Sequence, residues 1–459
     1  MVGEETLQIT ISNDLKMSYV PEAFKRELME IFTVVNPKWV ENERMGRWNR
    51  GTPKVIRCYH RFGGHGIRVP RGYARQLLLK CRRQALAYRV VDHRRRLAAV
   101  DFAFKARLRS FQREAVDQML ARDFGTLTAP TGSGKTVMAL AMVAARRQPA
   151  LIVVHTRNLA EQWVERIGQF MGIAAGEVGR IGGGRYKPGA QITVALVQSL
   201  YRRADEMRPR IGHIVVDECH HCPSRTFTEA VSAFDTFYMT GLSATPYRRD
   251  GLSRLIFWHL GDQHHRIERR RLEESGDVLQ AEVIVRHTHF SSHSDPVNEY
   301  SKILMELAAD DSRNHLIATD VAREAAHQKG VCLVLSDRKK HCQILYSLLR
   351  YKHGLRVALL TGDIAVPQRQ EIVADLDRGE IQVLVATGQL VGEGFDSKRL
   401  TTLFLTTPVR FSGRLLQYLG RVLRPAQGKE QARIFDYVDI NVAPLANAAQ
   451  ARQRVYRRS

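Results

Sequence analysis

The sequence predicts an α/β protein in which a small basic α+β domain precedes two tandem parallel-sheet domains. Short apolar runs alternate with stretches of helical periodicity, which is typical of parallel strands flanked by helices. This rhythm stops between about 261 and 297, where charged and turn-forming residues are concentrated, and then starts again. The length of 459 residues also exceeds one typical domain. We therefore expect domains at 1–105, 106–278 and 279–459.

The first of these regions mixes helical and extended patterns. A helix is expected over 21–32, and short strands over 54–59 and 67–69. The glycine-rich run 63–66 lies between the two strands. It predicts a hairpin loop, because glycine adopts positive φ at little cost.

Buried parallel strands are expected in both later domains, wherever a short β-rich apolar run ends in polar or glycine residues. In the first they lie at 125–129, 150–154, 192–196, 213–216 and 237–242. In the second they lie at 331–335, 356–360, 383–386 and 402–405. The chain ends in a basic segment, 449–459, that we expect to form a helix or a tail.

The charge is strongly positive and unevenly distributed. Lys and Arg number 70 against 47 Asp and Glu, a net charge of +23. Residues 44–109 hold 19 basic and 2 acidic residues, so +17 of the surplus lies there. This surplus predicts a polyanionic partner, nucleic acid before an anionic membrane surface. Because this +17 surplus precedes the motifs described below, it predicts a separate module that anchors the polyanion. A chain that begins near Lys105 should then keep its basal activity but bind the polyanion more weakly.

Aromatic residues are interleaved with this basic charge, which is a nucleic-acid signature. The alternative is that most of the rings pack a small core. The run from Arg94 to Arg96 is expected to be a surface patch and not a specific reader. The rings are Trp48, Tyr59, Phe62, Tyr73 and Tyr88.

Several other classes of protein are excluded. No apolar run approaches the ~18 residues that a membrane span needs. The first residues lack a basic segment followed by an apolar stretch, so a secretory signal is not expected. Six cysteines are too few for a disulfide framework, and we expect a reduced, cytoplasmic protein.

A phosphate-binding loop follows the strand expected at 125–129 and precedes a helical run. Small residues let backbone N–H groups turn toward phosphates, and the helix N-terminus adds its positive end. Lys135 can reach the β- and γ-phosphates of a nucleotide, and Thr136 can ligate Mg²⁺. The alternative is a glycine-rich turn with an incidental Lys-Thr pair. The loop consists of Ala129, Pro130, Thr131, Gly132, Ser133, Gly134, Lys135 and Thr136, with Ala129 where the strict pattern has glycine.

Two adjacent carboxylates follow the strand expected at 213–216. Asp217 is placed to hold Mg²⁺, and Glu218 to orient and deprotonate a water that attacks a phosphoanhydride. A strand that ends in Asp-Glu is common, but this one follows the phosphate loop by about 80 residues. Cys219 and Cys222 have metal-ligand spacing, but the chain offers no second ligand pair nearby, so zinc is not expected.

Two arginines lie three residues apart near the end of the last expected domain. Arg421 and Arg424 share a helix face, from which a guanidinium can meet γ-phosphate charge as an arginine finger does. In isolation, a solvated basic helix face is the favoured explanation for them.

In this order, the motifs resemble those of the superfamily 2 DExH-box helicases and translocases. The resemblance covers about 106–430 and includes the run from Arg109 to Gln112, the phosphate loop, the Asp-Glu pair with its histidine, and the run that ends in Arg424. Within the superfamily the chain looks most similar to XPB-type and phage UvsW-type DNA helicases. The resemblance implies two RecA-like domains with ATP in the cleft between them, and 3′→5′ movement along the strand.

The resemblance also implies a role for each motif residue. Adenine would be read by Arg109 and Gln112, and the nucleotide would be faced from the second domain by Gly394 and Asp396. The finger function would come from Arg421 and Arg424, with Gln417 near the attacking water. Hydrolysis would be coupled to domain movement through Ser243, Ala244 and Thr245. Nucleic acid would be contacted by His155, Thr156, Arg157, Thr193, Gln198, Ser199, Ser336 and Thr387.

The expected function is therefore an ATP- and Mg²⁺-dependent DNA helicase or translocase that remodels forked, branched or single-stranded DNA, for example in DNA repair. An RNA helicase is the first alternative, because the contacts that read the 2′-OH are not visible in a sequence. The second alternative is the motor subunit of a restriction or phage-defence complex, which would move DNA for a nuclease on another chain. The resemblance places the protein with bacterial, archaeal or phage helicases, associated with the nucleoid.

Overall fold

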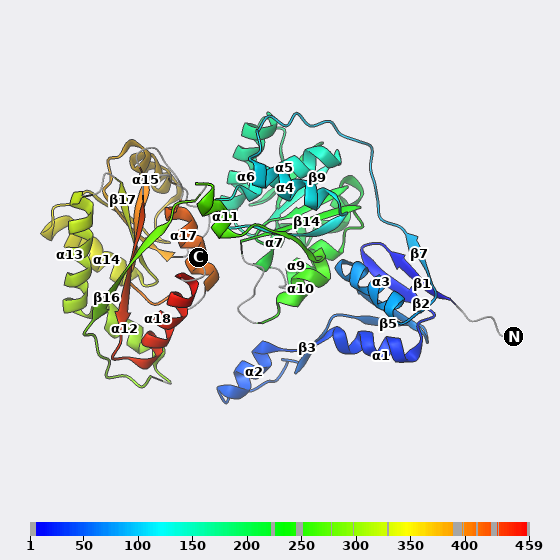
Figure 1. The fold of residues 1–459 in the computed structure, drawn as a ribbon, viewed down its shortest axis with the longest axis horizontal. Helices are drawn as coiled ribbons and strands as arrows, with labels where there is room; N and C mark the ends of the chain where they lie inside the picture. The colour runs from blue at the N-terminus through cyan, green and yellow to red at the C-terminus, as the bar shows by residue number, and fades with distance from the viewer. Residues whose placement is uncertain are drawn as a thin grey trace. The chain divides into compact units, whose positions relative to one another are not determined.

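A computed structural model of the chain describes residues 6–221, 225–244, 251–276, 278–296, 298–327, 330–388, 397, 399–409, 412–423, 429 and 431–456 (Figure 1). The chain divides into two compact units. The first consists of Met1–Ala129 and Gly134–Ile267, and the second of Pro130–Ser133 and Glu268–Ser459.

The first unit begins with a five-stranded sheet in the order β5-β6-β2-β1-β7. Neighbouring strands are antiparallel, except that β1 and β7 are parallel. Alternate residues of β1 and β2 are buried, as expected for strands with one face on a core. The elements are β1 (Leu7–Ile11), β2 (Asp14–Ser18), α1 (Glu22–Ile31), β5 (His60–Phe62), β6 (Gly66–Pro70), α3 (Ala74–Arg83) and β7 (Tyr88–Asp92).

A second, two-stranded sheet lies between α1 and β5 in the sequence. Strand β3 (Thr33–Val35) pairs antiparallel with β4 (Val55–Arg57), and α2 (Pro37–Arg44) lies between them in sequence. The helix expected at 21–32 is therefore confirmed as α1, but the hairpin was assigned to the wrong strand. The glycine-rich loop joins β5 to β6, whereas the strand expected at 54–59 is the shorter β4 and pairs elsewhere.

The larger sheet of the first unit has eight strands in the order β11-β10-β12-β9-β13-β14-β8-β15. All neighbours are parallel except β10 and β11, and all five strands expected here are present. They are β8 (Phe124–Thr128), β9 (Ala150–Val154), β12 (Ile192–Leu196), β13 (His213–Val216) and β14 (Tyr238–Ser243), and the additional strands are β10 (Gly179–Gly182), β11 (Arg185–Lys187) and β15 (Gln263–Arg266).

Helices pack on this sheet in two groups. In one group α5 packs against both α4 and α6, and in the other α9 packs against both α7 and α10 (Figure 1). Central strands β9 and β13 are buried along their whole length, which explains their continuous apolar sequences. The helices are α4 (Ser110–Leu120), α5 (Lys135–Arg146), α6 (Arg157–Met171), α7 (Val197–Leu200), α8 (Ala204–Met207), α9 (Arg225–Ser232) and α10 (Ser253–Leu260).

The second unit has a six-stranded parallel sheet in the order β16-β21-β20-β17-β19-β18. Its four expected strands are present as β17 (Val331–Ser336), β18 (Val357–Leu360), β19 (Val383–Thr387) and β20 (Leu400–Leu405), and β16 (Ala281–Thr288) and β21 (Ala432–Asp439) are additional. The two parallel sheets confirm the predicted fold class. The helices are α11 (Arg269–Glu274), α12 (Tyr300–Ala309), α13 (Asp311–His327), α14 (Lys339–Ser347), α15 (Val366–Arg378), α17 (Ser412–Val422) and α18 (Ala443–Tyr456).

The basic C-terminal segment forms part of α18 and is anchored to the sheet. The buried Arg452 donates to both carboxylate oxygens of Asp436, at 2.9 and 3.0 Å. The hydroxyl of Tyr456 donates to the same carboxylate at 3.0 Å. Of the helices in the described part of the chain, none combines the length and apolar composition needed to cross a membrane.

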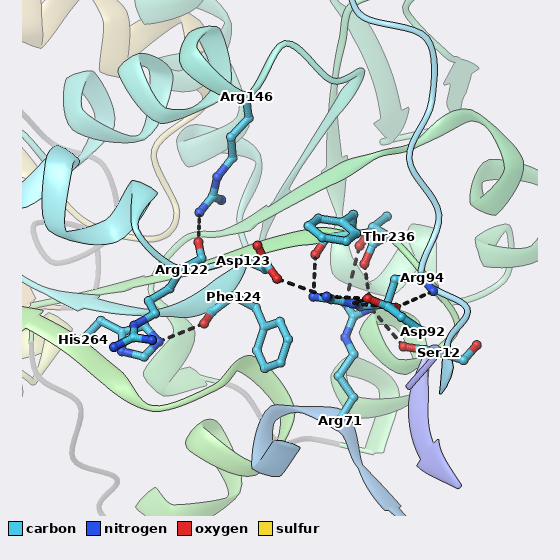
Figure 2. Close-up of polar contacts among 11 residues, drawn as sticks. Ser12, Arg71, Asp92, Arg94, Arg122, Asp123, Phe124, Arg146, Thr236 and His264 are labelled. Atoms are coloured by element: carbon cyan, nitrogen blue, oxygen red, sulfur yellow. Dashed lines mark hydrogen bonds and ion pairs between the residues drawn. The ribbon is translucent and has the colours of Figure 1, made fainter. Parts of the chain in front are cut away.

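The N-terminal sheet shares a hydrophobic core with the larger sheet's helix α10. Leu255 and Trp258 of α10, and Leu252 just before it, are buried in the same cluster as residues of β1, β2 and α1. Arg71 is also buried here, and its Nη1 donates to the carbonyl of Thr236 at 2.8 Å (Figure 2). Residues 1–105 are therefore packed onto the first parallel-sheet domain and are not the independent module that the charge distribution suggested.

One residue of the arginine run 94–96 differs from its expected role in a surface patch. The Arg94 side chain is 7% exposed and forms ion pairs with Asp92 and Asp123 (Figure 2). The guanidinium of Arg96 lies 3.7 Å from the centre of the Phe237 ring. The expectation was wrong for Arg94, whose buried side chain binds the connecting segment to the first parallel sheet, whereas Arg96 is exposed, as expected of a surface patch.

Candidate active site

The phosphate-loop sequence joins the end of β8 to the start of α5. Gly132 and Gly134 adopt positive φ, +91° and +84°, so the chain makes the tight turn that a phosphate-binding loop needs. Helix α5 then begins at Lys135. The Lys135 Nζ donates to the carbonyl of Ala129 at 3.2 Å, which holds the ammonium over the loop.

Gln112 of α4 lies against this loop. A Cβ atom added to Gly134 would be 2.5 Å from Nε2 of Gln112, so only glycine leaves space for the amide. The Gln112 Oε1 accepts a 3.0 Å hydrogen bond from the backbone N–H of Arg109. The structure therefore brings the two residues expected to read adenine together at the start of α4, with Gln112 buried and Arg109 exposed.

A buried arginine of α5, Arg146, binds the C-terminal end of α4 and the residues that follow it. The Arg146 guanidinium donates to the carbonyl of Met119 at 3.1 Å. It donates as well to the carbonyl of Arg122 at 2.8 Å (Figure 2). It also contacts Nε2 of His213 at 2.9 Å. Burial lowers the pKa of His213 well below its ordinary value, so the imidazole is neutral and Nε2 accepts from Arg146.

Asp217 follows β13 and is held by a tryptophan. The indole Nε1 of Trp163, in α6, donates to Oδ2 of Asp217 at 2.8 Å. The other carboxylate oxygen, Oδ1, accepts from the backbone N–H of Glu218 at 2.8 Å. Burial and the neighbouring Glu218 charge raise the pKa of Asp217 to about 6. A cation at this carboxylate would relieve both effects.

Glu218 adopts a backbone conformation that is unusual for a residue with a side chain. Its φ is +46°, which costs about 1–3 kcal/mol and indicates that the surrounding structure fixes its position. Its Oε1 lies 4.0 Å from the Lys135 Nζ. Its Oε2 lies 3.3 Å from Nδ1 of His220. The second carboxylate and the loop lysine are therefore neighbours.

The third strand end at this edge of the sheet is that of β14. The buried Ser243 contacts Nδ1 of His220 through its hydroxyl at 3.0 Å. Its carbonyl accepts a 2.9 Å hydrogen bond from the backbone N–H of Ala129. A continuous chain of contacts thus joins the phosphate loop to Ser243, His220 and Glu218. Ala244 follows Ser243, and Thr245 lies outside the described residues.

The donor atoms at this site suit a nucleotide with Mg²⁺. Mg²⁺ prefers hard oxygen ligands, which the Asp217 carboxylate and the Thr136 hydroxyl supply, and it leaves other positions to phosphate oxygens and water. The ammonium of Lys135 and the backbone of the glycine-containing loop suit the phosphates.

Comparison with known proteins places this site in a family. A model described as "Type III restriction enzyme, res subunit" matches residues 105–248, and the "Helicase conserved C-terminal domain" matches residues 323–426, together more than half of the chain. The chain belongs to the superfamily 2 helicases. It is therefore a helicase-type, nucleic-acid-dependent ATPase, and the two matches correspond to the predicted motif order.

This helicase also resembles individual proteins. It is 29% identical over 356 residues to the DNA 3′-5′ translocase XPB2 of Sulfurisphaera tokodaii, covering 70% of this chain and 79% of that protein. It is 26% identical over 379 residues to the probable helicase D10 of Escherichia phage T5, covering 82% and 80%. A solved fragment of a putative HsdR subunit from Vibrio vulnificus has the same fold, with a TM-score of 0.56, 19% identity, and coverage of 75% of this chain and 66% of that one.

The residues that the motifs assign to nucleic acid in the first unit of the helicase differ in exposure. Arg157 and Gln198 are exposed, and Gln198 donates weakly to the His155 carbonyl at 3.4 Å, so these three residues lie together. Thr156 caps α6 by accepting from Leu159 N–H at 3.3 Å. Thr193 is fully buried, and its hydroxyl accepts from Gly189 N–H at 3.0 Å, so it lies inside the lobe. Ser199 is half-buried in α7.

In the second unit the motif residues are described less completely. The Ser336 hydroxyl is buried and accepts from Arg338 N–H at 3.1 Å, so it supports the turn after β17. Thr387 ends β19 and is half-buried. Gln417 and Arg421 belong to α17, but their side chains are not described. Gly394, Asp396 and Arg424 lie outside the described residues.

For two residues of the site, the helicase motifs had predicted no role. Trp163 lies 54 residues before Asp217, inside an ordinary amphipathic helix, so no local pattern marks its role. His220 does belong to the Asp-Glu-x-His run, and its position two residues after Glu218 was the available signal. Its contact with Ser243 requires the pairing of two distant strands and could only be seen in the structure.

Proposed function

We propose that this superfamily 2 enzyme is an ATP-dependent DNA helicase or translocase that couples hydrolysis to movement along forked, branched or single-stranded DNA. The supporting observation is the assembly of Lys135, Asp217 and Glu218 with Gln112 where β8, β13 and β14 end. Relatives named as DNA 3′-5′ translocases and helicases support DNA as the nucleic acid, and 3′→5′ as the direction. Two other relatives are named as putative ATP-dependent RNA helicases, so RNA belongs in the test.

In the proposed reaction, Lys135 and the loop from Ala129 to Thr136 bind the phosphates of ATP, and Arg109 and Gln112 bind adenine. Asp217 and Thr136 hold Mg²⁺, which when bound neutralises phosphate charge. Glu218 orients the attacking water and accepts its proton. The contacts of Glu218 with Lys135 and His220 fit this role, because they hold the carboxylate beside the phosphate loop before substrate binds.

The second unit supplies the remaining proposed residues. The residues proposed to serve hydrolysis from this unit are Gly394, Asp396, Gln417, Arg421 and Arg424. In related phosphoryl-transfer enzymes, an arginine that meets the γ-phosphate charge increases the rate by about 10³–10⁵. Ser243, Ala244 and Thr245 transmit the state of the nucleotide site to the rest of the enzyme.

Nucleic acid is gripped through its phosphates. In the first unit, Arg157 and Gln198 offer exposed side chains beside the half-buried His155. Thr156 caps α6, the buried Thr193 accepts from Gly189 N–H, and Ser199 is half-buried in α7. In the second unit, Ser336 and Thr387 are the residues proposed to lie at the nucleic-acid strand. The exposed basic residues of 1–105 add further phosphate contacts. Because phosphates and not bases are read, affinity should fall steeply with salt.

The test compares wild-type enzyme with Lys135→Ala and Glu218→Gln in ATP hydrolysis. Single-stranded, duplex and forked DNA, and RNA of equal length, serve as activators. Loss of phosphate and water contacts should lower the stimulated rate by several orders of magnitude. Lys340→Ala, which removes an exposed lysine of α14, is the matched control and should behave as wild type. Intact hydrolysis in Glu218→Gln, or stimulation by RNA alone, would contradict the proposal.

A second candidate is the motor subunit of a restriction or defence complex. The observation that favours it is the match of residues 105–248 to a restriction-enzyme subunit model. A nuclease that co-purifies with the chain from its own host, and that cleaves DNA only when Lys135 is intact, would support it. Strand displacement by the isolated chain at full rate would favour the helicase.

A further inference from the structure

A segment of the N-terminal region, which we call the arm, consists of residues 33–57. It contains β3, α2 and β4 and a connecting loop at 45–54. In Figure 1, α2 lies at the end of this segment, beyond β3. None of the residues of α2 is buried. A helix of eight residues with no buried face gains little stability from packing. The position of α2 on the arm is therefore not explained by the core of the domain.

The tip of the arm exposes a tryptophan. Trp48 is 86% exposed, the largest value among the exposed large hydrophobic residues in the described chain. Trp163 and Trp258 are 2% and 5% exposed. Trp39 is half-buried, and the Lys54 ammonium lies 5.1 Å from its ring centre. Of the four tryptophans in the sequence, Trp48 is therefore the one whose ring is open to a ligand.

The loop that carries Trp48 is held in a defined shape. The Asn49 side chain donates to the Trp39 carbonyl at 3.3 Å and to Glu43 Oε1 at 2.9 Å, and it accepts from Asn42 Nδ2 at 2.9 Å. At the other end, Asn36 Nδ2 donates to the Pro53 carbonyl at 2.9 Å. These contacts fix the backbone on both sides while the neighbouring indole points outward. An aromatic ring displayed on a fixed loop loses little entropy when it binds.

The charge around the indole identifies the kind of ligand. Residues 44–57 contain five basic residues and no acidic one. Arg44, Arg47 and Arg50 are all exposed and flank Trp48 in the sequence. Glu43, the nearest acid before them, accepts from Asn49. Guanidinium groups beside an open indole suit the alternation of phosphates and bases in a single strand, where every unpaired base offers a stacking face.

We propose that the arm binds single-stranded DNA, with Trp48 stacked on an unpaired base and Arg44, Arg47 and Arg50 at the neighbouring phosphates. This rests on the proposed function, because it gives the DNA motor a site for the unpaired strand. It also divides the basic charge of 44–109 into two groups. Arg71 and Arg94 hold the N-terminal region onto the first lobe, whereas the arm's arginines remain available for DNA.

The test uses the full-length protein, and its tryptophan emission is measured as oligothymidylate or a blunt duplex of equal length is added. Wild type should be quenched by the single strand, and Trp48→Phe should lose most of this quenching but keep its affinity. Trp48→Ala should weaken single-strand binding about fivefold to a hundredfold. Arg47→Ala should reduce the salt slope by about one unit. Tyr351→Ala removes a 76%-exposed tyrosine between Arg350 and Lys352 and should leave binding unchanged.

Two measurements separate this inference from the proposed function. Lys135→Ala should abolish hydrolysis but keep the quenching, and Trp48→Ala should keep the hydrolysis rate measured without DNA. DNA-stimulated hydrolysis together with unchanged single-strand affinity in Trp48→Ala would overturn the stacking site and leave the motor intact. Equal losses on the single strand and the blunt duplex would also overturn it. So would a Trp48-dependent protein partner whose binding does not compete with oligothymidylate.

Discussion

The indole Nε1 of Trp163 donates a 2.8 Å hydrogen bond to Oδ2 of Asp217. Because the Asp217 Oδ1 accepts from Glu218 N–H, both oxygens of this carboxylate are oriented before any ligand arrives. Trp163 is almost completely buried, so the donor cannot turn away. Such outer contacts typically change metal affinity or activity about 10–100-fold when removed.

Trp163→Phe should therefore weaken the response to Mg²⁺. Phenylalanine keeps an aromatic ring in α6 but removes the N–H, and losing that hydrogen bond raises the pKa of Asp217 further. We expect the Mg²⁺ concentration for half-maximal ATP hydrolysis to rise about tenfold or more. Trp258→Phe, at a buried tryptophan of α10, is the control. A Trp163→Phe enzyme with a native melting temperature and an unchanged Mg²⁺ requirement would show that Trp163 only fills space.

Asp217→Asn should stabilise the protein at alkaline pH while abolishing hydrolysis. The carboxyl has a pKa of about 6 when folded, against an ordinary value of 3.8. Below pH 3.8 Asp217 is protonated in both the folded and the unfolded protein, so its ionisation does not change the free energy of unfolding. Between pH 3.8 and about 6 the carboxyl ionises in the unfolded protein but not in the folded one, so the free energy of unfolding falls as pH rises. Above about 6 the cost is constant, roughly 1–3 kcal/mol. Asparagine removes this cost, and its single amide oxygen accepts from Trp163, whereas the hydrogen bond from the Glu218 N–H is lost and subtracts from the gain.

Urea unfolding of ligand-free enzyme at pH 8 and pH 4.5 measures this difference. The Asn variant should be more stable than wild type at pH 8, and the gain should shrink toward pH 4.5. A loss of stability at pH 8 would mean that the Asp217 charge is compensated by Lys135 more completely than its raised pKa indicates.

Arg71→Ala should destabilise the whole first unit. Burial lowers the pKa of Arg71 to about 10, and its guanidinium donates to the carbonyls of Ser12 and Thr236. The truncation leaves these carbonyls without their donor, at about 1–3 kcal/mol for each buried group, and adds a cavity. Arg71→Met, which fills more of the space, should lose less. Equal melting temperatures for Arg71→Ala and wild type would contradict the docking role.

Deletion of residues 1–104 tests the same interface more severely. The sequence alone suggested that a chain beginning near Lys105 keeps its basal activity. The structure predicts the opposite, because the deletion exposes Leu252, Leu255 and Trp258. Exposed apolar surface of this kind promotes association. We expect the shortened protein to aggregate and to hydrolyse ATP poorly, as measured by light scattering and ATPase assay.

The parts of the fold that could be predicted are those in which the residues of one segment are enough to indicate whether it is buried. Central strands such as β9 and β13 are apolar throughout because both faces are buried. Strands β15 and β16 lie at sheet edges and carry polar residues, so the segment 261–297 read as a connection although it supplies both strands. The hairpin of β5 and β6 was misassigned because β5 is exposed and short.

The same distinction applies to the site. Lys135, Asp217 and Glu218 could be predicted because the chemistry needs those residue types soon after strands of one sheet, here β8 and β13. Trp163 and Arg71 could not, because their partners lie 54 and 165 residues away and any amphipathic segment can carry a Trp or an Arg. Net charge was also ambiguous, since the sequence does not distinguish Arg94, which is paired internally, from Arg47, which is exposed.

Ser243→Ala should separate hydrolysis from movement. The substitution removes the hydroxyl that contacts His220 at 3.0 Å but keeps the Ser243 carbonyl that accepts from Ala129 N–H, so the phosphate loop stays in place. Because His220 also lies 3.3 Å from Glu218, losing the hydroxyl interrupts the contact chain between the nucleotide site and the end of β14. Strand displacement per ATP hydrolysed should fall about fivefold or more, the range of typical coupling energies. Ser232→Ala is a matched control, because it breaks another serine–histidine contact, with His259 at 3.2 Å, away from the site. If both variants lose displacement and hydrolysis in the same proportion, Ser243 serves stability and not coupling.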